Sequence, residues 1–311
     1  MSATRLQGAT VARPAARAGW LTLQHRRYLI AFLFVLPALI NFAVFRYIPI
    51  FMAGRASLYD YSLLGGFGDF VGTKNYVHAV EDDLFWTSMR VSVQYAFMKV
   101  PAQVVLALLL ALFVSRASRG MGIIRTIIFF PVVTSLVVAA MLWSMMYNKD
   151  LGLIQSMLGA FGLRHQGFLS SPVLALPSIV LMMVWKEVGF SMIIFVAGLK
   201  GIPEMFYDAA AIDGASPIQR FFSITLPLLK PVTLFVVVTQ TISAMQVFVP
   251  IFVMTQGGPF FATNAIVYYI YQNGFAYNDM GYASALSFFV LALLVTVSYF
   301  QFRLLKGKVE Y

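Results

Sequence analysis

Six long runs of apolar residues constrain what this chain can fold into. Each is long enough to cross about 30 Å of hydrocarbon, which takes about 20 helical residues. The runs lie at 28 to 50, 91 to 114, 122 to 147, 173 to 198, 229 to 254 and 280 to 302. Hydrophobic residues fill 60% of the 311 positions and charged residues 11%, a balance that no soluble core accommodates. The sequence therefore predicts an all-α membrane protein with six spans.

The composition also excludes several kinds of chemistry. The chain has no cysteine, so disulfides, thiolate nucleophiles and sulfur-bound metals are not expected. His25, His78 and His165 lie in tails or loops without a helical His/Glu pair, so neither a metal site nor a proton relay is indicated. Nothing matches the phosphate-binding pattern Gly, four residues, Gly-Lys-Ser/Thr. The chain is therefore not expected to hydrolyse ATP by itself or to bind a cofactor.

The two ends of the chain are basic tails. The first 27 residues contain five arginines and no acid, and the apolar run that follows is too long for a signal-peptide core. We interpret residues 1–27 as a disordered cytoplasmic tail before an uncleaved first span. Residues 28–305 then form one six-span domain, and 306–311 a second cytoplasmic tail.

The cations predict the orientation of the spans. With the N-terminus in the cytoplasm, the outer segments contain four cations and the cytoplasmic segments contain fourteen. The fourteen are Arg5, Arg13, Arg17, Arg26, Arg27, Arg116, Arg119, Arg125, Lys200, Arg220, Lys230, Arg303, Lys306 and Lys308. This asymmetry fits the positive-inside rule, with both termini in the cytoplasm. The formal charge of +10 thus reflects topology and anionic lipid rather than nucleic acid.

The segment 199–230, between the fourth and fifth runs, is more than a polar turn. Pro203 and Glu204 suit the first turn of a helix, where a missing N–H is tolerated and a negative charge complements the helix dipole. Gly214 suits the left-handed residue that ends a helix, and Pro217 prevents its continuation. The sequence predicts a short amphipathic helix here. By itself such a helix could lie on the inner leaflet or dock on a partner.

The spacing within this segment resembles a known family. Asp208-Ala209-Ala210, three residues, Gly214, nine residues, Ile224, one residue and Leu226-Pro227 is similar to the cytoplasmic loop of membrane subunits of bacterial ATP-driven importers. Gly257-Gly258-Pro259 with Thr263, and Gly281 to Ala285, are similar to the end of sugar-importer permeases of the maltose-permease type. The family usually has Glu where this chain has Asp208, which is one methylene shorter, so contacts of that carboxylate are expected to be displaced or bridged by water.

The resemblance implies a fold and a set of partners. It implies the six-transmembrane-helix bundle of a type I ABC importer permease, in the bacterial cytoplasmic (inner) membrane, with a cytoplasmic coupling helix. Two copies of a separate ATPase, which bind ATP and Mg, would receive that helix. A second homologous permease subunit would complete the pore, and an extracytoplasmic binding protein would deliver a sugar or similar small polar solute. The coupling residues implied are Asp208, Ala209, Ala210, Gly214, Ile224, Leu226 and Pro227.

Polar residues at membrane depth are candidates for the solute path. An ionisable residue in mid-span costs at least about 2.5 kcal/mol, so it is expected to face the protein or a wet cavity. Lys186 and Glu187 lie near the centre of the fourth span, and Gln240 lies at matching depth in the fifth. In the resembled family these two helices hold the solute, which implies contacts from Met183, Lys186, Glu187, Phe190, Gln240 and Ser243. The alternative is that the charged residues form interhelical ion pairs and Gln240 an interhelical hydrogen bond.

Other conspicuous side chains favour structural roles. Lys99, about two turns inside the second predicted span, is expected to snorkel outward. Trp143 and Trp185 are expected to pack or to lie in an interfacial belt, and so is the aromatic stretch from Tyr268 to Tyr277.

The alternative function from another class is an ion-coupled secondary transporter in which Lys186 and Glu187 titrate or gate. That hypothesis explains the buried charges but not the amphipathic loop helix. The broken helices common in such carriers are also not evident in the sequence. A membrane-embedded enzyme is disfavoured, because no catalytic constellation lies within the spans.

Overall fold

The computed structural model describes residues 23–115 and 120–305 and divides the chain into two units, 1–52 and 53–311. The predicted tails lie outside the described residues over 1–22 and 306–311. The first unit is a helix that continues into the second: α1 (Leu23–Phe42), the π-helix η1 (Ala43–Tyr47) and α2 (Ile48–Ala56). The π-turn precedes Pro49, which has no N–H to donate to the carbonyl of Phe45. Because α1 begins at Leu23, Arg26 and Arg27 are helical rather than disordered as predicted, and their cytoplasmic location stays a prediction.

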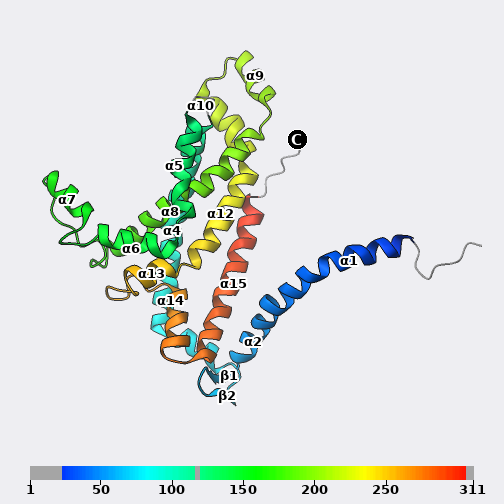
Figure 1. Ribbon diagram of the computed structural model, residues 1–311, viewed down its shortest axis with the longest axis vertical. Coiled ribbons are helices and arrows are strands. Elements are labelled where there is room, and N and C mark those ends of the chain that lie inside the picture. Colours follow the sequence, from blue (N-terminus) through cyan, green and yellow to red (C-terminus); the bar gives the residue numbers. More distant parts are fainter. Residues whose placement is uncertain (1–22, 116–119, 306–311) are drawn as a thin grey trace, which may run out of the picture. The chain divides into compact units, whose positions relative to one another are not determined.

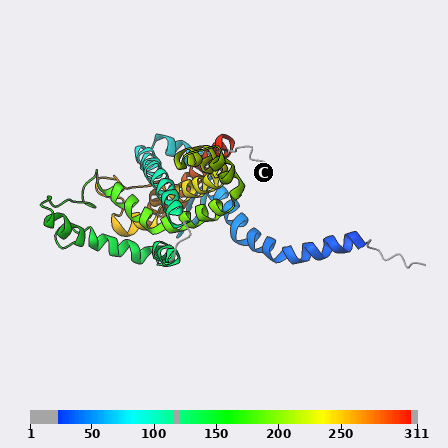
Figure 2. The same cartoon turned by 90° about the horizontal axis from the view of Figure 1, so that it is seen from above.

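The second unit is built on packed helices (Figure 1). They are α4 (Asp83–Val114), α5 (Met121–Val133), α8 (Ala175–Lys200), α12 (Lys230–Met245) and α15 (Met280–Leu305). α8 packs against α4, α5 and α12, and α12 also packs against α4 and α15. Viewed from above, these helices gather closely together (Figure 2). Four helices of the described residues are long and apolar enough to cross a membrane, or up to six spans if each of two bent pairs counts as one. The predicted fold class is therefore confirmed.

Two of the predicted spans are not single helices. The run 122–147 is divided into α5 and α6 (Leu136–Met146), which are bent by 97°. The break follows Pro131, and the extended backbone of Ser135 starts the new helix. The run 229–254 is divided into α12 and α13 (Val249–Met254), because Pro250 cannot donate to the preceding turn and instead lies at the start of a new helix. The apolar runs did not indicate these two breaks.

Short elements connect the main helices. A hairpin of β1 (Tyr59–Ser62) and β2 (Gly66–Phe70) pairs Tyr59 with Phe70 and Ser62 with Gly66, and α3 (Lys74–Glu81) follows it. The remaining connections contain α7 (Leu153–Ala160), α14 (Ile266–Tyr271) and the π-helix η3 (Gln272–Ala276). Together the hairpin and α3 pack against α15. The hairpin and α3 thus cover part of α15.

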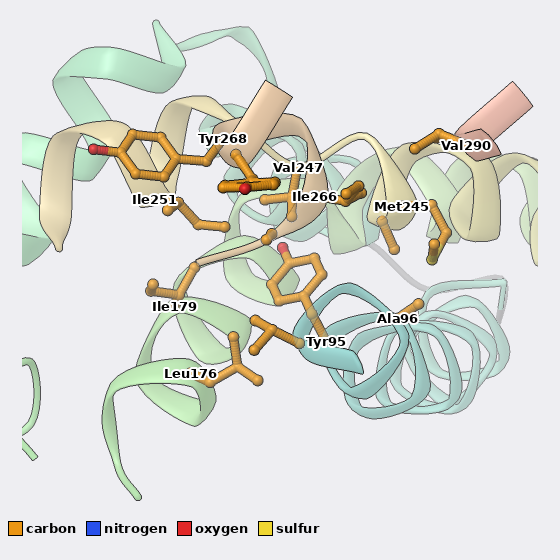
Figure 3. Packing of buried hydrophobic residues seen from close by; sticks show 14 of the residues in the cluster. Tyr95, Ala96, Leu176, Ile179, Met245, Val247, Ile251, Ile266, Tyr268 and Val290 are labelled. Carbon is orange, nitrogen blue, oxygen red and sulfur yellow. The ribbon is translucent and has the colours of Figure 1, made fainter. Parts of the chain in front are cut away.

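The main apolar core lies where α4 meets α8 and the segment from α12 to α14. Tyr95 of α4 is fully buried and lies near Leu176 and Ile179 of α8 and Ile266 of α14 (Figure 3). A second cluster toward the other end joins α4, α8 and α12 through small residues such as Ala107 and Ala111. The two apolar clusters hold the three helices together at both ends, and the polar residues described below lie on the same three helices.

Asp82 joins three helices at one end of the bundle. Its carboxylate caps α4 at the N–H of Leu84 and accepts hydrogen bonds from Tyr269 of α14 at 2.5 Å and Tyr282 of α15 at 2.6 Å. Burial alone would raise the pKa of the Asp82 carboxyl, but these hydrogen bonds outweigh it and lower the pKa below 3.8. Burial and the bond to Asp82 raise the pKa of Tyr269 to about 12. The carboxylate is therefore ionised at neutral pH.

Candidate functional site: an exposed loop helix and a polar cavity

The predicted loop helix is present as α9 (Glu204–Ile212), which begins after Pro203 in extended backbone. Gly214 ends it with φ +74°, a left-handed conformation in which an added Cβ would meet nothing within 4 Å. None of the residues of α9 is buried. Met205, Phe206 and Ile212 are 69%, 40% and 87% exposed, so this helix presents apolar side chains that residues 23–115 and 120–305 leave uncovered.

The segment after Gly214 returns to the bundle through α10 (Pro217–Arg220), the π-helix η2 (Phe221–Thr225) and α11 (Leu226–Leu228). Ser216 and Gln219 form a reciprocal capping box at the start of α10. η2 precedes Pro227, which removes one backbone donor, as Pro49 does for η1. A hydrogen bond of 2.9 Å between Tyr207 and Thr225 ties α9 to η2. The loop helix is thus connected through short, capped helical turns to α12.

The predicted coupling residues all lie in the stretch from α9 to α11. Asp208, Ala209 and Gly214 are exposed, whereas Ala210, Ile224, Leu226 and Pro227 are half-buried. The residues of α9 and its turn are thus mostly accessible to a partner, whereas those of η2 and α11 are partly covered. Figure 1 shows α9 and α10 at one end of the unit, away from α13 and α14.

The second candidate region is a polar cluster between α4, α8 and α12. Lys99 Nζ lies 2.6 Å from Glu187 Oε2 and 2.9 Å from Gln240 Oε1. The Gln240 amide donates to Ser191 at 3.3 Å, and Gln103 donates to the same hydroxyl at 3.2 Å. Lys99 is fully buried, whereas the Glu187 side chain is 26% exposed. A continuous chain of hydrogen bonds thus links three helices at membrane depth.

The position of Lys99 corrects the prediction that it snorkels outward. The helix begins at Asp83 rather than near residue 91, so Lys99 lies at its middle, more than about 20 Å along the helix axis from either end. A side chain of four methylenes cannot reach either surface from there. It is held instead by a carboxylate and an amide oxygen, the partners that a buried ammonium requires.

Lys186 makes a different contact. Its Nζ donates to the carbonyl of Val132 at 2.9 Å, in the last turn of α5, where a cation also complements the helix dipole. α5 approaches closely because position 189 is glycine: a Cβ there would lie 2.5 Å from the Ile128 carbonyl oxygen. Lys186 therefore does not form an ion pair with Glu187, which is paired with Lys99.

A cavity of about 310 Å³ opens beside this cluster, lined by Val132, Lys186, Glu187, Phe190, Thr239, Gln240 and Ser243. Its volume lies at the small end of the range for ligand pockets, and its lining offers an ammonium, a carboxylate, an amide and two hydroxyls. Another cavity, of about 280 Å³ between α4, α12 and α15, is almost entirely apolar. Of these two cavities, the first has the donors and acceptors that a polar solute requires.

Five of the six residues predicted to contact solute line this cavity. The exception is Met183, which is 5% exposed and belongs to the apolar core. Sequence reasoning missed Val132 and Thr239, which the cavity includes, and Ser191, which supports Gln240. Thr239 is adjacent to Gln240 in the sequence and could have been found from that; nothing in the sequence brings Val132 to α8. Trp143 and Trp185 contact each other at 5.4 Å between ring centroids, in keeping with a packing role.

Comparison with known proteins identifies the chain. The profile of the family described as "Binding-protein-dependent transport system inner membrane component" matches residues 103–311. The trehalose/maltose transport system permease protein MalF of Thermococcus litoralis is 36% identical over 281 residues, covering 90% of this chain and 95% of that protein. The sn-glycerol-3-phosphate transport system permease protein UgpA of Yersinia enterocolitica is 34% identical, covering 96% and 98%. The chain belongs to this permease family.

Similarity to solved structures supports the same fold for this permease. A chain of a bacterial alginate ABC transporter, in complex with alginate pentasaccharide-bound periplasmic protein, superposes with a TM-score of 0.80 at 23% identity, covering 91% of this chain and 98% of that one. The chain is thus a multi-pass inner-membrane permease of a binding-protein-dependent transport system, and its relatives are transport subunits. This membership, rather than an absence of broken helices, excludes the secondary transporter.

Proposed function

We propose that this permease forms half of the pore of an ATP-driven importer for a sugar or sugar-like polar solute. A second, homologous permease subunit completes the pore. Two copies of a cytoplasmic ATPase, which bind ATP and Mg, supply the energy. A binding protein delivers the solute from outside, and both termini of this permease lie in the cytoplasm. The solute class is supported by relatives named for trehalose/maltose and sn-glycerol-3-phosphate transport.

The observation that carries the coupling role is the uncovered apolar surface of α9. A nine-residue helix with no buried residue gains little stability from its own chain, and its exposed Met205, Phe206 and Ile212 provide the apolar face that fits a groove on a partner. Asp208, Ala209, Ala210 and Gly214 form the slim end of this helix and its turn. Ile224, Leu226 and Pro227 transmit its displacement to α12, which begins three residues after Pro227.

The polar cavity is the proposed solute site of this half. Lys186, Glu187, Phe190, Gln240 and Ser243 line it, and a cavity of hydrogen-bonding side chains replaces the water shell of a polar solute. Met183 of α8 contributes by packing in the apolar core rather than by contact with the solute. Movement of α9 changes the position of α12, which carries Gln240 and Ser243, so one helix joins the ATPase contact to the solute.

Reconstitution tests the proposal. Purified alone, this permease is expected to hydrolyse no ATP. Combined with its partner permease, its ATPase and its binding protein in proteoliposomes, it is expected to support ATP hydrolysis that rises when the binding protein carries solute. Nucleotide hydrolysis by the isolated chain, or stimulation by solute without a binding protein, would refute the division of labour.

A further inference from the structure

The charge around the polar cavity is unbalanced. Lys99 and Lys186 contribute two positive charges and Glu187 one negative charge, and Glu187 is paired with Lys99 at 2.6 Å. Lys186 is held by the uncharged carbonyl of Val132 and forms no ion pair within residues 23–115 and 120–305, although Glu187 in the lining of the same cavity attracts its ammonium. Together with the buried Lys99 behind it, the cavity therefore carries a formal charge of +1.

The other charged residues of the surrounding helices do not offset this charge. Arg90, nine residues before Lys99, lies about 13.5 Å along α4 from it, and Arg125 of α5 donates to the Val114 carbonyl at the far end of α4. Both are cations. Asp83 lies at the N-terminus of α4 and Lys200 at the C-terminus of α8, so neither approaches the middle of the membrane.

An unpaired charge at membrane depth is expensive unless a solute or water compensates it. Lys186 is 7% exposed, and the part of its side chain that is accessible borders the cavity. The neighbouring amide of Gln240 and the hydroxyls of Thr239 and Ser243 suit the hydroxyl groups of a sugar. The site thus combines a point of positive charge with neutral hydrogen-bonding groups.

We propose that this permease transports an anionic sugar-like solute, with Lys186 as the group that binds its carboxylate, phosphate or sulfate. The proposal rests on the proposed function and names the class of solute for its site. Lys99 is a positioning residue: it neutralises Glu187, so that this carboxylate does not repel the anion, and it fixes the orientation of Gln240.

The absence of cysteine allows the charge to be measured without knowledge of the solute. In the assembled importer, Ser243→Cys places a single reactive thiol of this chain in the cavity, and Ser156→Cys places one in the exposed helix α7 as the control. The modification rates by an anionic and a cationic methanethiosulfonate reagent are compared, and labelling of this chain is identified by its mass.

Relative to the control thiol, the cavity thiol of Ser243→Cys is expected to favour the anionic reagent. The ratio of the anionic to the cationic rate should fall at least about tenfold with Lys186→Met, rise with Glu187→Gln, and change little with Lys186→Arg. Lys99→Met should lower it as Lys186→Met does. The proposal is wrong if the ratio of the anionic to the cationic rate is the same for the cavity thiol and the control thiol, or does not respond to the charge at position 186. Lys186 would then only cap the C-terminus of α5.

Protection tests the class of solute. Glucuronate and glucose 6-phosphate are expected to slow modification of the cavity thiol by an uncharged maleimide more than glucose does, and Lys186→Met should abolish the difference. If all three compounds protect equally, or glucose alone protects, in an importer whose ATP hydrolysis is still stimulated by its binding protein, the solute is not anionic and the proposal is wrong. Loss of that hydrolysis in the unsubstituted importer would instead refute the proposed function.

Discussion

Replacement of Lys99 by methionine tests the buried ion pair. Methionine keeps much of the length and apolar volume of the side chain but removes the ammonium that contacts Glu187 and Gln240. The carboxylate of Glu187 is then left without its partner. Removal of one member of a buried pair costs about 3 to 5 kcal/mol, and the lower end applies because Glu187 is 26% exposed to the cavity.

The second member of the pair provides the internal control. With Lys99→Met and Glu187→Gln together, no charge is left unpaired, and the remaining loss is about 1 kcal/mol for the lost hydrogen bonds. Adding Glu187→Gln to Lys99→Met should thus restore about 2 kcal/mol of the stability lost. Thermal unfolding of the assembled permease measures it: Lys99→Met should lower the midpoint by about 6 to 12 °C, and the double variant should recover most of that.

Lys230→Met removes an exposed lysine at the start of α12 and should leave stability within about 0.5 kcal/mol. The reasoning is refuted if Lys99→Met is as stable as the unsubstituted protein, or if Glu187→Gln adds a further loss to it. Either result would mean that the carboxylate is already neutral or solvated without Lys99.

Three further predictions concern glycine contacts and the Asp82 junction. Gly189→Ala should destabilise the permease by about 1 to 3 kcal/mol, because the added Cβ meets backbone atoms of α5. Gly122→Ala is the control and should leave stability unchanged, because its added Cβ meets nothing within 4 Å. Equal unfolding midpoints of the two variants would contradict the contact between position 189 and α5. Gly214→Val should uncouple ATP hydrolysis from transport, because a β-branched residue in the left-handed conformation costs about 1 to 2 kcal/mol. Gly214→Asn should retain more coupling, because asparagine tolerates that conformation. Wild-type transport by the valine variant would count against the docking role of α9. The lowered pKa of Asp82 means that its stabilisation is present above pH 3.8 and is lost only as the pH falls through the lower pKa of the folded state. The difference in thermal unfolding midpoint between the unsubstituted protein and Asp82→Asn should therefore be the same at every pH between about 5 and about 8. A difference that disappears within that range would show a higher pKa for Asp82.

The loop helix could be predicted because local rules determine it. Pro203, Gly214 and Pro217 limit the helix from within the segment itself, and α9 begins and ends where these residues indicate. Lys186, Glu187 and Gln240 were likewise singled out by their positions within the apolar runs, and the structure gathers them around one cavity.

Contacts between helices could not be predicted in this way. The start of α4 was placed too late because Asp83 and Arg90 interrupt the apolar run, so Lys99 was placed close to a surface when it lies at mid-helix. The pairing of Lys99 with Glu187 depends on the rotation of α4 against α8, for which hydropathy carries no signal. The helix breaks after Pro131 and before Pro250 were hidden because both halves of each run are apolar.

Solute uptake into proteoliposomes tests the division of labour most directly. Vesicles contain this permease, its partner permease and the ATPase. ATP is either present inside the vesicles or absent, and the binding protein is either present or omitted outside. In a parallel series, a proton or sodium gradient replaces ATP as the energy source. We predict uptake only with both internal ATP and external binding protein, and none driven by either gradient. Uptake driven by an ion gradient in vesicles that contain this chain alone would contradict the importer function.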